Sequence, residues 1–208
     1  MTPVLKLAAK AARRFYYDAF LAPRGYGRPV ARATWDSQYQ QGEWDRLGSI
    51  DELAHYMVIV GYVRYLFESP SILDVGCGSG RLAQLLSPVP FENYLGVDIS
   101  SAAIDKACAL EVSKSKFETA DLETWSPDRK FDAIVFNESL YYARRPVDVL
   151  LRYFDSLAAD GALIVSLCRY GNHGIIWQNV AKSLSILDST TVENSKGQVW
   201  DIKVLIRE

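Results

Sequence analysis

From residue 70 onwards, short apolar runs alternate with stretches whose apolar residues recur at helical spacing. The runs predicted as strands are Ser71–Val75, Tyr94–Val97, Lys116–Thr119, Ala133–Asn137 and Ala162–Cys168. The helices predicted between them are Arg81–Leu86, Ser101–Glu111 and Pro146–Ala158. Almost continuously apolar strands separated by helices are typical of a parallel sheet that is covered on both faces. We therefore predict a doubly wound α/β fold.

The pattern changes at both ends of this region. Ile186–Val192 and Gln198–Ile206 flank a turn-prone stretch and predict an antiparallel hairpin at the sheet edge. Ahead of the sheet there is no strand pattern, and Asp51–Phe67 predicts an apolar helix. An earlier helix has basic residues at positions 6, 10, 13 and 14 on one face. We expect an N-terminal helical arm and lid in residues 1–49 and the main domain in residues 50–208.

The charge of the chain is unevenly distributed. The net charge of the 208 residues is −2, but residues 1–34 contain seven basic residues and one acidic residue, which leaves 16 basic and 24 acidic residues in the remainder. The near-neutral total argues against a nucleic-acid coat protein. Three widely spaced cysteines and no long uncharged apolar run favour a cytoplasmic protein without disulfides or a membrane span.

The most informative segment is residues 71–86, in which a strand is followed by a glycine turn and a helix. Asp74 ends the apolar run, and Gly76, Gly78 and Gly80 follow at every second position. This spacing differs from the dinucleotide fingerprint G-x-G-x-x-G. A carboxylate two residues before the first glycine would repel a pyrophosphate and attract a cationic ligand. The turn therefore favours S-adenosylmethionine, which has a sulfonium, over NAD.

Acidic residues follow the next two strands. Asp98 ends the second strand, where a carboxylate can accept hydrogen bonds from both ribose hydroxyls, and Ile99 could pack against adenine. Asp121 and Leu122 follow the third strand, where an acceptor could receive the adenine amino protons. Structural alternatives stay open: Asp74 could orient its loop, and Asp98 or Asp121 could cap the following segment.

These motifs, with FDAIVFNESLYY and LAADGALIVSL after them, resemble the class I S-adenosylmethionine-dependent methyltransferases over residues 50–208. The resemblance implies a Rossmann-like seven-stranded sheet of order 3-2-1-4-5-7-6 with strand 7 antiparallel. It implies that the glycine loop wraps the methionine part of the cofactor, that Asp98 holds the ribose, and that Asp121 and Leu122 flank adenine. Asn137 matches a position beside the methionine. The cofactor would be S-adenosylmethionine, with S-adenosylhomocysteine as the product and no metal.

Candidates for the acceptor end follow strands 4 and 5. Glu138 is the first choice for orienting the acceptor or accepting its proton, and His173 is the second. Tyr141 and Tyr142 could wall the acceptor pocket. The motif Glu138-x-Leu140-Tyr141-Tyr142 resembles that of the nodulation N-methyltransferases, and this resemblance implies a small polar or glycan acceptor. The Asn-Pro-Pro-Tyr pattern of enzymes that methylate base amines is absent.

Residues 35–44, which we call the lid segment, are aromatic, polar and punctuated by glycine, as suits a segment that folds over a ligand. Related enzymes often place a tyrosine here near the cofactor carboxylate, so Tyr39 is the candidate. The alternative is that Trp35 and Trp44 only anchor the packing.

Two other functions stay open. The basic arm could dock an RNA or protein methyltransferase onto its substrate, or the chain could be a non-catalytic cofactor-binding subunit. Residues 1–34 could contact a membrane surface or a protein, or form a solvated helix face.

Overall fold

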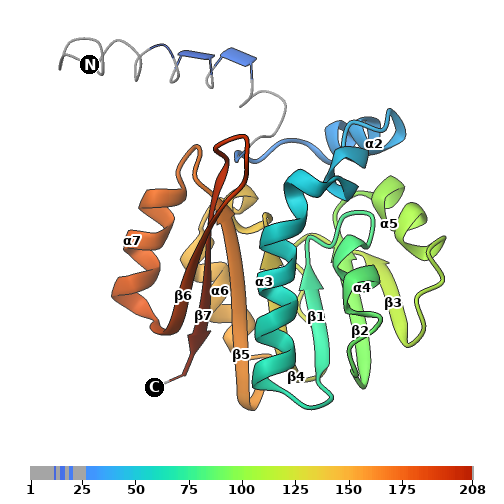
Figure 1. Ribbon diagram of the computed structural model, residues 1–208, viewed down its shortest axis with the longest axis vertical. Helices are drawn as coiled ribbons and strands as arrows, with labels where there is room; N and C mark the ends of the chain where they lie inside the picture. The colour runs from blue at the N-terminus through green and yellow to red at the C-terminus, as the bar shows by residue number, and fades with distance from the viewer. Residues whose placement is uncertain (1–11, 13–14, 17–18, 21–26, 208) are drawn as a thin grey trace.

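The computed structural model describes residues 12, 15, 16, 19, 20 and 27–207 (Figure 1). The basic helix expected around residues 6–14 lies outside the described residues, apart from position 12. The proposed division at residue 49 stays a prediction. Among the described residues, no helix is both long and apolar enough to cross a membrane.

A seven-stranded sheet of order β3-β2-β1-β4-β5-β7-β6 forms the centre of the molecule. Its strands are β1 Ser71–Val75, β2 Asn93–Asp98, β3 Ser115–Thr119, β4 Phe131–Asn137, β5 Leu157–Cys168, β6 Ser185–Glu193 and β7 Val199–Ile206. Strand β7 is antiparallel to both β5 and β6, and the other pairs are parallel. The predicted sheet order and the antiparallel hairpin are confirmed.

Helices cover both faces of the sheet (Figure 1). The helical elements from residue 32 onwards are α2 Arg32–Gln40, η3 Asp45–Gly48, α3 Ile50–Leu66, α4 Arg81–Leu86, α5 Ser101–Cys108, η4 Leu140–Tyr142, α6 Pro146–Phe154 and α7 His173–Ser183. Helices α3 and α4 pack on one face, and α6 and α7 pack on the other. Because both faces of the sheet are covered, the central strands are apolar at almost every position.

Alternate side chains of β1 show how the strands serve two cores. Ile72 packs with Ile59 and Val63 of α3, whereas the next residue, Leu73, belongs to the core beneath α6 and α7. Successive residues of a strand point to opposite faces, so each core receives every second side chain. Because the sheet is fixed from both sides, the loops at the carboxyl ends of its strands have a rigid base.

The structure corrects two of the predicted helix ends and adds one helix that was not predicted. Helix α5 stops at Cys108 instead of residue 111, and the backbone turns left-handed at Glu111 (φ 50°). Helix α6 stops at Phe154, because Leu157 pairs with Phe131 and begins β5. Helix α7 was not predicted, although Ile176, Trp177 and Val180 bury one of its faces.

Candidate functional site

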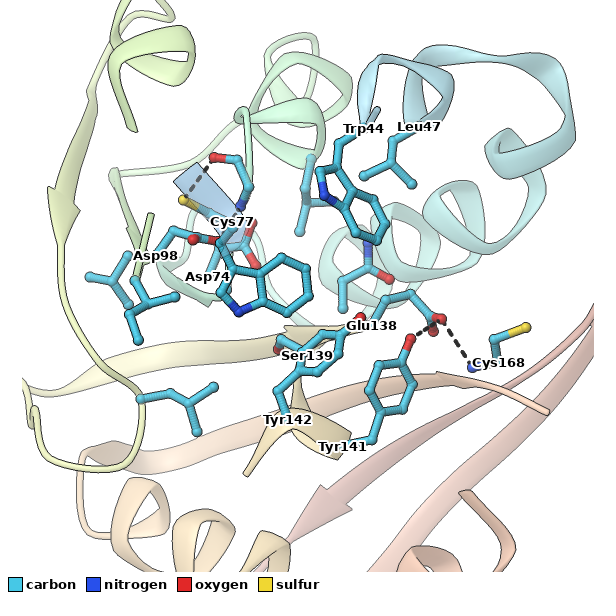
Figure 2. A pocket seen from close by; sticks show the side chains of 18 of the residues that line it. Trp44, Leu47, Asp74, Cys77, Asp98, Glu138, Ser139, Tyr141, Tyr142 and Cys168 are labelled. Atoms are coloured by element: carbon cyan, nitrogen blue, oxygen red, sulfur yellow. Dashed lines mark hydrogen bonds between the residues drawn. The ribbon is translucent and has the colours of Figure 1, made fainter. Parts of the chain in front are cut away.

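A cavity of about 400 Å³ lies at the carboxyl ends of the central strands, between the sheet and the lid segment. Figure 2 shows Asp74 and Asp98 towards one end of it and Glu138, Tyr141 and Cys168 towards the other. Ten of the predicted site residues line it. They are Tyr39, Asp74, Gly76, Gly78, Asp98, Ile99, Asp121, Leu122, Asn137 and Glu138. The size and place of the cavity are typical of ligand sites in open parallel sheets.

Two glycines of the loop after β1 are required by the protein's own packing. A Cβ atom on Gly76 would lie 2.3 Å from the Cβ of Ser139, and one on Gly78 would lie 2.6 Å from the Tyr39 hydroxyl. Both residues have positive φ. Gly80 does not line the cavity, because the space beside its Cα is filled by Leu110, Ala107 and Phe117. Its predicted contact with a cofactor is not supported by its position.

Asp74 is buried at the end of β1 with one oxygen satisfied. The Tyr94 hydroxyl donates to its Oδ2 at 2.5 Å, whereas its Oδ1 has no partner among the described residues. Burial raises the pKa of Asp74 to about 7, against the opposing effect of the Tyr94 hydrogen bond. The Oδ1 of Asn137, at the end of β4, is also buried without a described partner. Two unsatisfied acceptors therefore border this end of the cavity and call for a donor.

The Asp98 carboxylate joins the glycine loop to the start of α5. Its Oδ2 accepts from the Gly78 N–H at 2.9 Å, and its Oδ1 accepts from the Ser100 N–H at 2.9 Å. Burial raises its pKa to about 6, although these backbone donors favour the anion. Ser100, not Asp98, caps α5, since its hydroxyl accepts from the Ala103 N–H. Each carboxylate oxygen keeps a lone pair for a ligand.

Asp121 combines the two roles that the sequence left open. It lines the cavity, and its Oδ1 accepts from the Glu123 N–H at 2.8 Å. The carboxylate thus fixes the turn after β3 while its residue borders the cavity. Leu122 and Ile99 supply apolar surface at the same end.

The lid segment is held over the cavity by aromatic packing and one carboxylate. Trp35 packs against Trp44 and against the edge of Tyr142, with ring centroids 5.6 and 4.8 Å apart. Asp36 accepts from the Ser100 hydroxyl at 2.7 Å and from the Ala102 N–H at 3.2 Å. The two tryptophans are therefore packing anchors and cavity walls at once.

Glu138 is held by three donors from two segments, η4 and β5. Its Oε2 accepts from the Tyr141 hydroxyl at 2.7 Å and from the Cys168 N–H at 3.1 Å, and its Oε1 accepts from the Ser166 hydroxyl at 3.0 Å. Its backbone has a positive φ of 58°, which is uncommon for a residue with a side chain. Burial raises its pKa to about 8, although the three donors favour the carboxylate. A carboxyl group that titrates near neutral pH suits proton transfer.

His173 is not part of this site. It begins α7 instead of lying in a loop, and it does not line the cavity. The prediction that it touches an acceptor is therefore not supported by its position. The helix start was missed because the glycines at 171 and 174 resembled a loop.

The structure adds lining residues that the sequence analysis did not select. They are Arg46, Glu52, Ser139, Tyr170, Gln198 and Trp200, among others. Glu52 and Trp200 belong to a helix and a strand that are far apart in the sequence. An acidic residue in a largely apolar helix was the sequence feature that could have pointed to Glu52. Among the described residues, no cluster of three or more His, Cys, Asp or Glu could hold a metal ion.

Comparisons with known proteins agree with this geometry. Residues 42–182 match the family model of the methyltransferase domain. Trans-aconitate 2-methyltransferase of Methylobacterium radiotolerans is 33% identical over 106 residues, covering 50% of this chain and 40% of that protein. Nodulation protein S of Bradyrhizobium diazoefficiens is 32% identical over 108 residues, covering 49% and 51%. The chain thus spans about half or less of the length of these relatives.

A solved structure shows the same fold over most of the chain. The N-methyltransferase NodS of Bradyrhizobium japonicum WM9, in complex with S-adenosylhomocysteine, superposes with a TM-score of 0.68 at 15% identity, covering 82% of this chain and 98% of NodS. The family match extends over more than half of the chain, and the strand order is the one that the family resemblance implied. The chain belongs to the class I S-adenosylmethionine-dependent methyltransferases, the family whose cofactor is S-adenosylmethionine.

Proposed function

We propose that the protein transfers a methyl group from S-adenosylmethionine to an oxygen or nitrogen atom of a small polar acceptor. The observation that carries this proposal is the division of one cavity into two chemically different ends. One end has the glycine loop, Asp74 and Asp98, and the other has Glu138 held among tyrosines. One cavity that holds both partners can align the acceptor with the methyl group, which is the main requirement of a direct displacement.

The residues at the loop end fit the proposed cofactor. The buried Oδ1 atoms of Asp74 and Asn137 have no described partner, and the ammonium group of a methionine moiety would supply the missing donors. The free lone pairs of Asp98 suit the two ribose hydroxyls, and Ile99 and Leu122 offer apolar surface for adenine. Tyr39, whose hydroxyl lies over the Gly78 backbone, would contact the methionine carboxylate. When bound, the cofactor supplies a methyl group on a positively charged sulfur.

At the other end, Glu138 would orient the acceptor and accept its proton. Donors from Tyr141, Ser166 and Cys168 fix the carboxylate, so that it does not reorganise when an acceptor arrives. Tyr141 is itself hydrogen-bonded to the Tyr170 hydroxyl at 2.7 Å, which extends the fixed network along the cavity wall. The lid segment would exclude water from the reacting atoms.

Calorimetry and turnover together test this proposal. The protein should bind S-adenosylmethionine and S-adenosylhomocysteine but not NAD, and it should release S-adenosylhomocysteine in the presence of a suitable acceptor. Glu138→Gln should keep the cofactor affinity within about twofold and lower turnover by about 10²-fold or more. Absence of cofactor binding by the wild-type protein would contradict the proposal. Full turnover by Glu138→Gln would remove Glu138 from the mechanism.

One structural neighbour was solved in complex with a protein partner. A putative methyltransferase of Haloferax volcanii, solved in complex with the activator Trm112, superposes with a TM-score of 0.67 at 14% identity. Docking of a protein, an RNA or a membrane surface through residues 1–34 stays a proposal. Deletion of residues 1–26 removes five of the seven basic residues and stops before the cavity-lining residues Pro29 and Val30. It should leave cofactor binding intact and abolish such docking, which sedimentation with a partner or with anionic vesicles would measure.

A further inference from the structure

Acidic side chains predominate in the part of the cavity lining that the structure describes. The acidic lining residues are Glu52, Asp74, Asp98, Asp121, Glu123 and Glu138, and the basic ones are Arg46 and Arg144. Both arginines are paired with lining acids, since Arg46 lies 3.1 Å from Glu52 and Arg144 lies 3.6 Å from Glu123. The cofactor would contribute one net positive charge at the loop end. The described lining therefore remains negative beside a bound cofactor.

The acceptor end contains two of these acids, Glu52 and Glu138, which are close enough to interact electrostatically. Burial raises the pKa of Glu138, and the charge of Glu52 adds to the effect. Glu52 is itself buried beside His55, whose Nδ1 is 3.8 Å from its Oε2. His55 cannot serve as a counter-ion, because burial lowers its pKa to about 3 and keeps it neutral. Two buried carboxyl groups thus interact at this end of the cavity, and Arg46 is the cation paired with Glu52.

Aromatic rings complete this end of the cavity. Tyr141, Tyr142, Tyr170 and Trp200 line it, with the Tyr141 and Tyr170 ring centroids 5.3 Å apart. Figure 2 shows Tyr141 directed towards Glu138, beside Cys168. Carboxylates among aromatic faces favour an organic cation, because the charges attract it and the rings replace part of its hydration. The same surroundings repel a carboxylate and offer no unpaired arginine among the described lining residues to receive one.

We infer that the acceptor is an amine that enters this site as an ammonium ion, and that dicarboxylates and tricarboxylates are excluded. This inference rests on the proposed methyl transfer. It separates this chain from the relatives named as trans-aconitate methyltransferases, whose named acceptor is a tricarboxylate. The difference lies in the charge of the acceptor end, which the shared cofactor motifs do not determine.

The chemistry of an amine acceptor balances with the groups present. With Glu138 ionised, a state that its pKa of about 8 favours increasingly towards alkaline pH, the ammonium first gives one proton to the carboxylate and keeps a nitrogen lone pair. That lone pair forms the new N–CH₃ bond while the bond between the methyl carbon and the sulfonium breaks, and the electron pair of the broken bond stays on sulfur. The methylated amine leaves as a cation, and Glu138 returns its proton to water.

A matched pair of ligands tests the inference on the full chain saturated with S-adenosylhomocysteine. Benzylamine and benzoate have the same ring and opposite charges, and calorimetry should show at least tenfold tighter binding of benzylamine. Glu138→Gln and Glu52→Gln should each reduce this preference at least threefold. Asp160→Asn, which removes an exposed carboxylate outside the cavity, should leave the preference unchanged. Thermal unfolding of each variant checks that it is folded.

Turnover distinguishes this inference from the function on which it rests. A panel of primary amines, with glucosamine and benzylamine among them, is compared with trans-aconitate and malonate by the release of S-adenosylhomocysteine. Methylation of amines alone supports the inference. Methylation of trans-aconitate or malonate, or benzoate binding as tight as that of benzylamine, overturns it while the methyltransferase function stands. If neither ligand binds, the inference is overturned. If the cofactor itself does not bind, the proposed function has failed.

Discussion

The two ends of the cavity are built in different ways. At the cofactor end, most contacts come from residues within a few positions of a strand end, and backbone N–H groups of Gly78 and Ser100 hold Asp98. At the acceptor end, Glu138 is held by side chains and backbone of β5 and η4, and it faces residues from α3 and β7. A site built from local backbone has little freedom to vary, whereas one built from distant side chains can change its specificity through single substitutions.

Asp74→Asn has the largest expected effect, which is a change in how the free energy of unfolding depends on pH. The folded-state pKa of about 7 lies above the ordinary value of 3.8, so the folded protein binds the proton more tightly than the unfolded chain. Stability is therefore lost as pH rises from about 4 to 7, by up to about 4 kcal/mol. Asn can still accept from Tyr94, so the variant should gain stability relative to wild type over this range. Urea unfolding without cofactor measures the difference, and parallel pH curves would contradict it.

The effect of Asp98→Ala on cofactor affinity should distinguish the two ends of the cavity most clearly. Removal of the carboxylate deletes the proposed ribose acceptors and releases the N–H groups of Gly78 and Ser100. Two charge-assisted hydrogen bonds correspond to about 3 kcal/mol, or a loss of cofactor affinity of about 10²-fold. Calorimetry with S-adenosylhomocysteine measures it, with Asp160→Ala as the control. An affinity within threefold of wild type would exclude the ribose role.

Gly76→Ala should act on folding, because the loop after β1 crosses Ser139 closely. The added Cβ would approach the Cβ of Ser139 to 2.3 Å, at a backbone φ of 79°. Strain of this kind costs about 2 kcal/mol or more. Gly48→Ala is the matched control, since a Cβ there meets nothing within 4 Å. Chemical denaturation should show the difference between the two variants, and equal losses of stability would mean that the loop can move away from Ser139.

A pair of tyrosine substitutions gives the smallest effect and the sharpest comparison. Tyr39→Phe at the cofactor end should weaken S-adenosylhomocysteine binding by about 1 kcal/mol, which is about fivefold. Tyr170→Phe at the acceptor end removes the hydroxyl beside Tyr141 and should change that affinity less than twofold. Its effect should appear in turnover instead. If both substitutions weaken cofactor binding equally, the division of the cavity into two ends is wrong.

The sequence predicted the sheet because its strands are apolar on both faces, and the boundaries of β1 and α4 match their predicted ranges. The predicted cofactor-end residues line the cavity, apart from Gly80, whose surroundings are filled by Leu110, Ala107 and Phe117. Helix α7 was missed because glycines surround its start, and His173 was assigned to the site because it follows the fifth predicted strand. The roles of the predicted site residues in binding and catalysis stay predictions until the variants are measured.

By itself the sequence determined the fold and the cofactor end, because strand, turn and acid follow one another within a few residues and the chain geometry places them together. Tertiary structure decided which further residues join Glu138, Tyr141 and Tyr142 at the acceptor end. Glu52 and Trp200 are 148 positions apart in the sequence and line the same cavity only because β7 inserts between β5 and β6 while α3 packs across the same face. No local pattern encodes such an arrangement, and the acceptor preference that we infer depends on it.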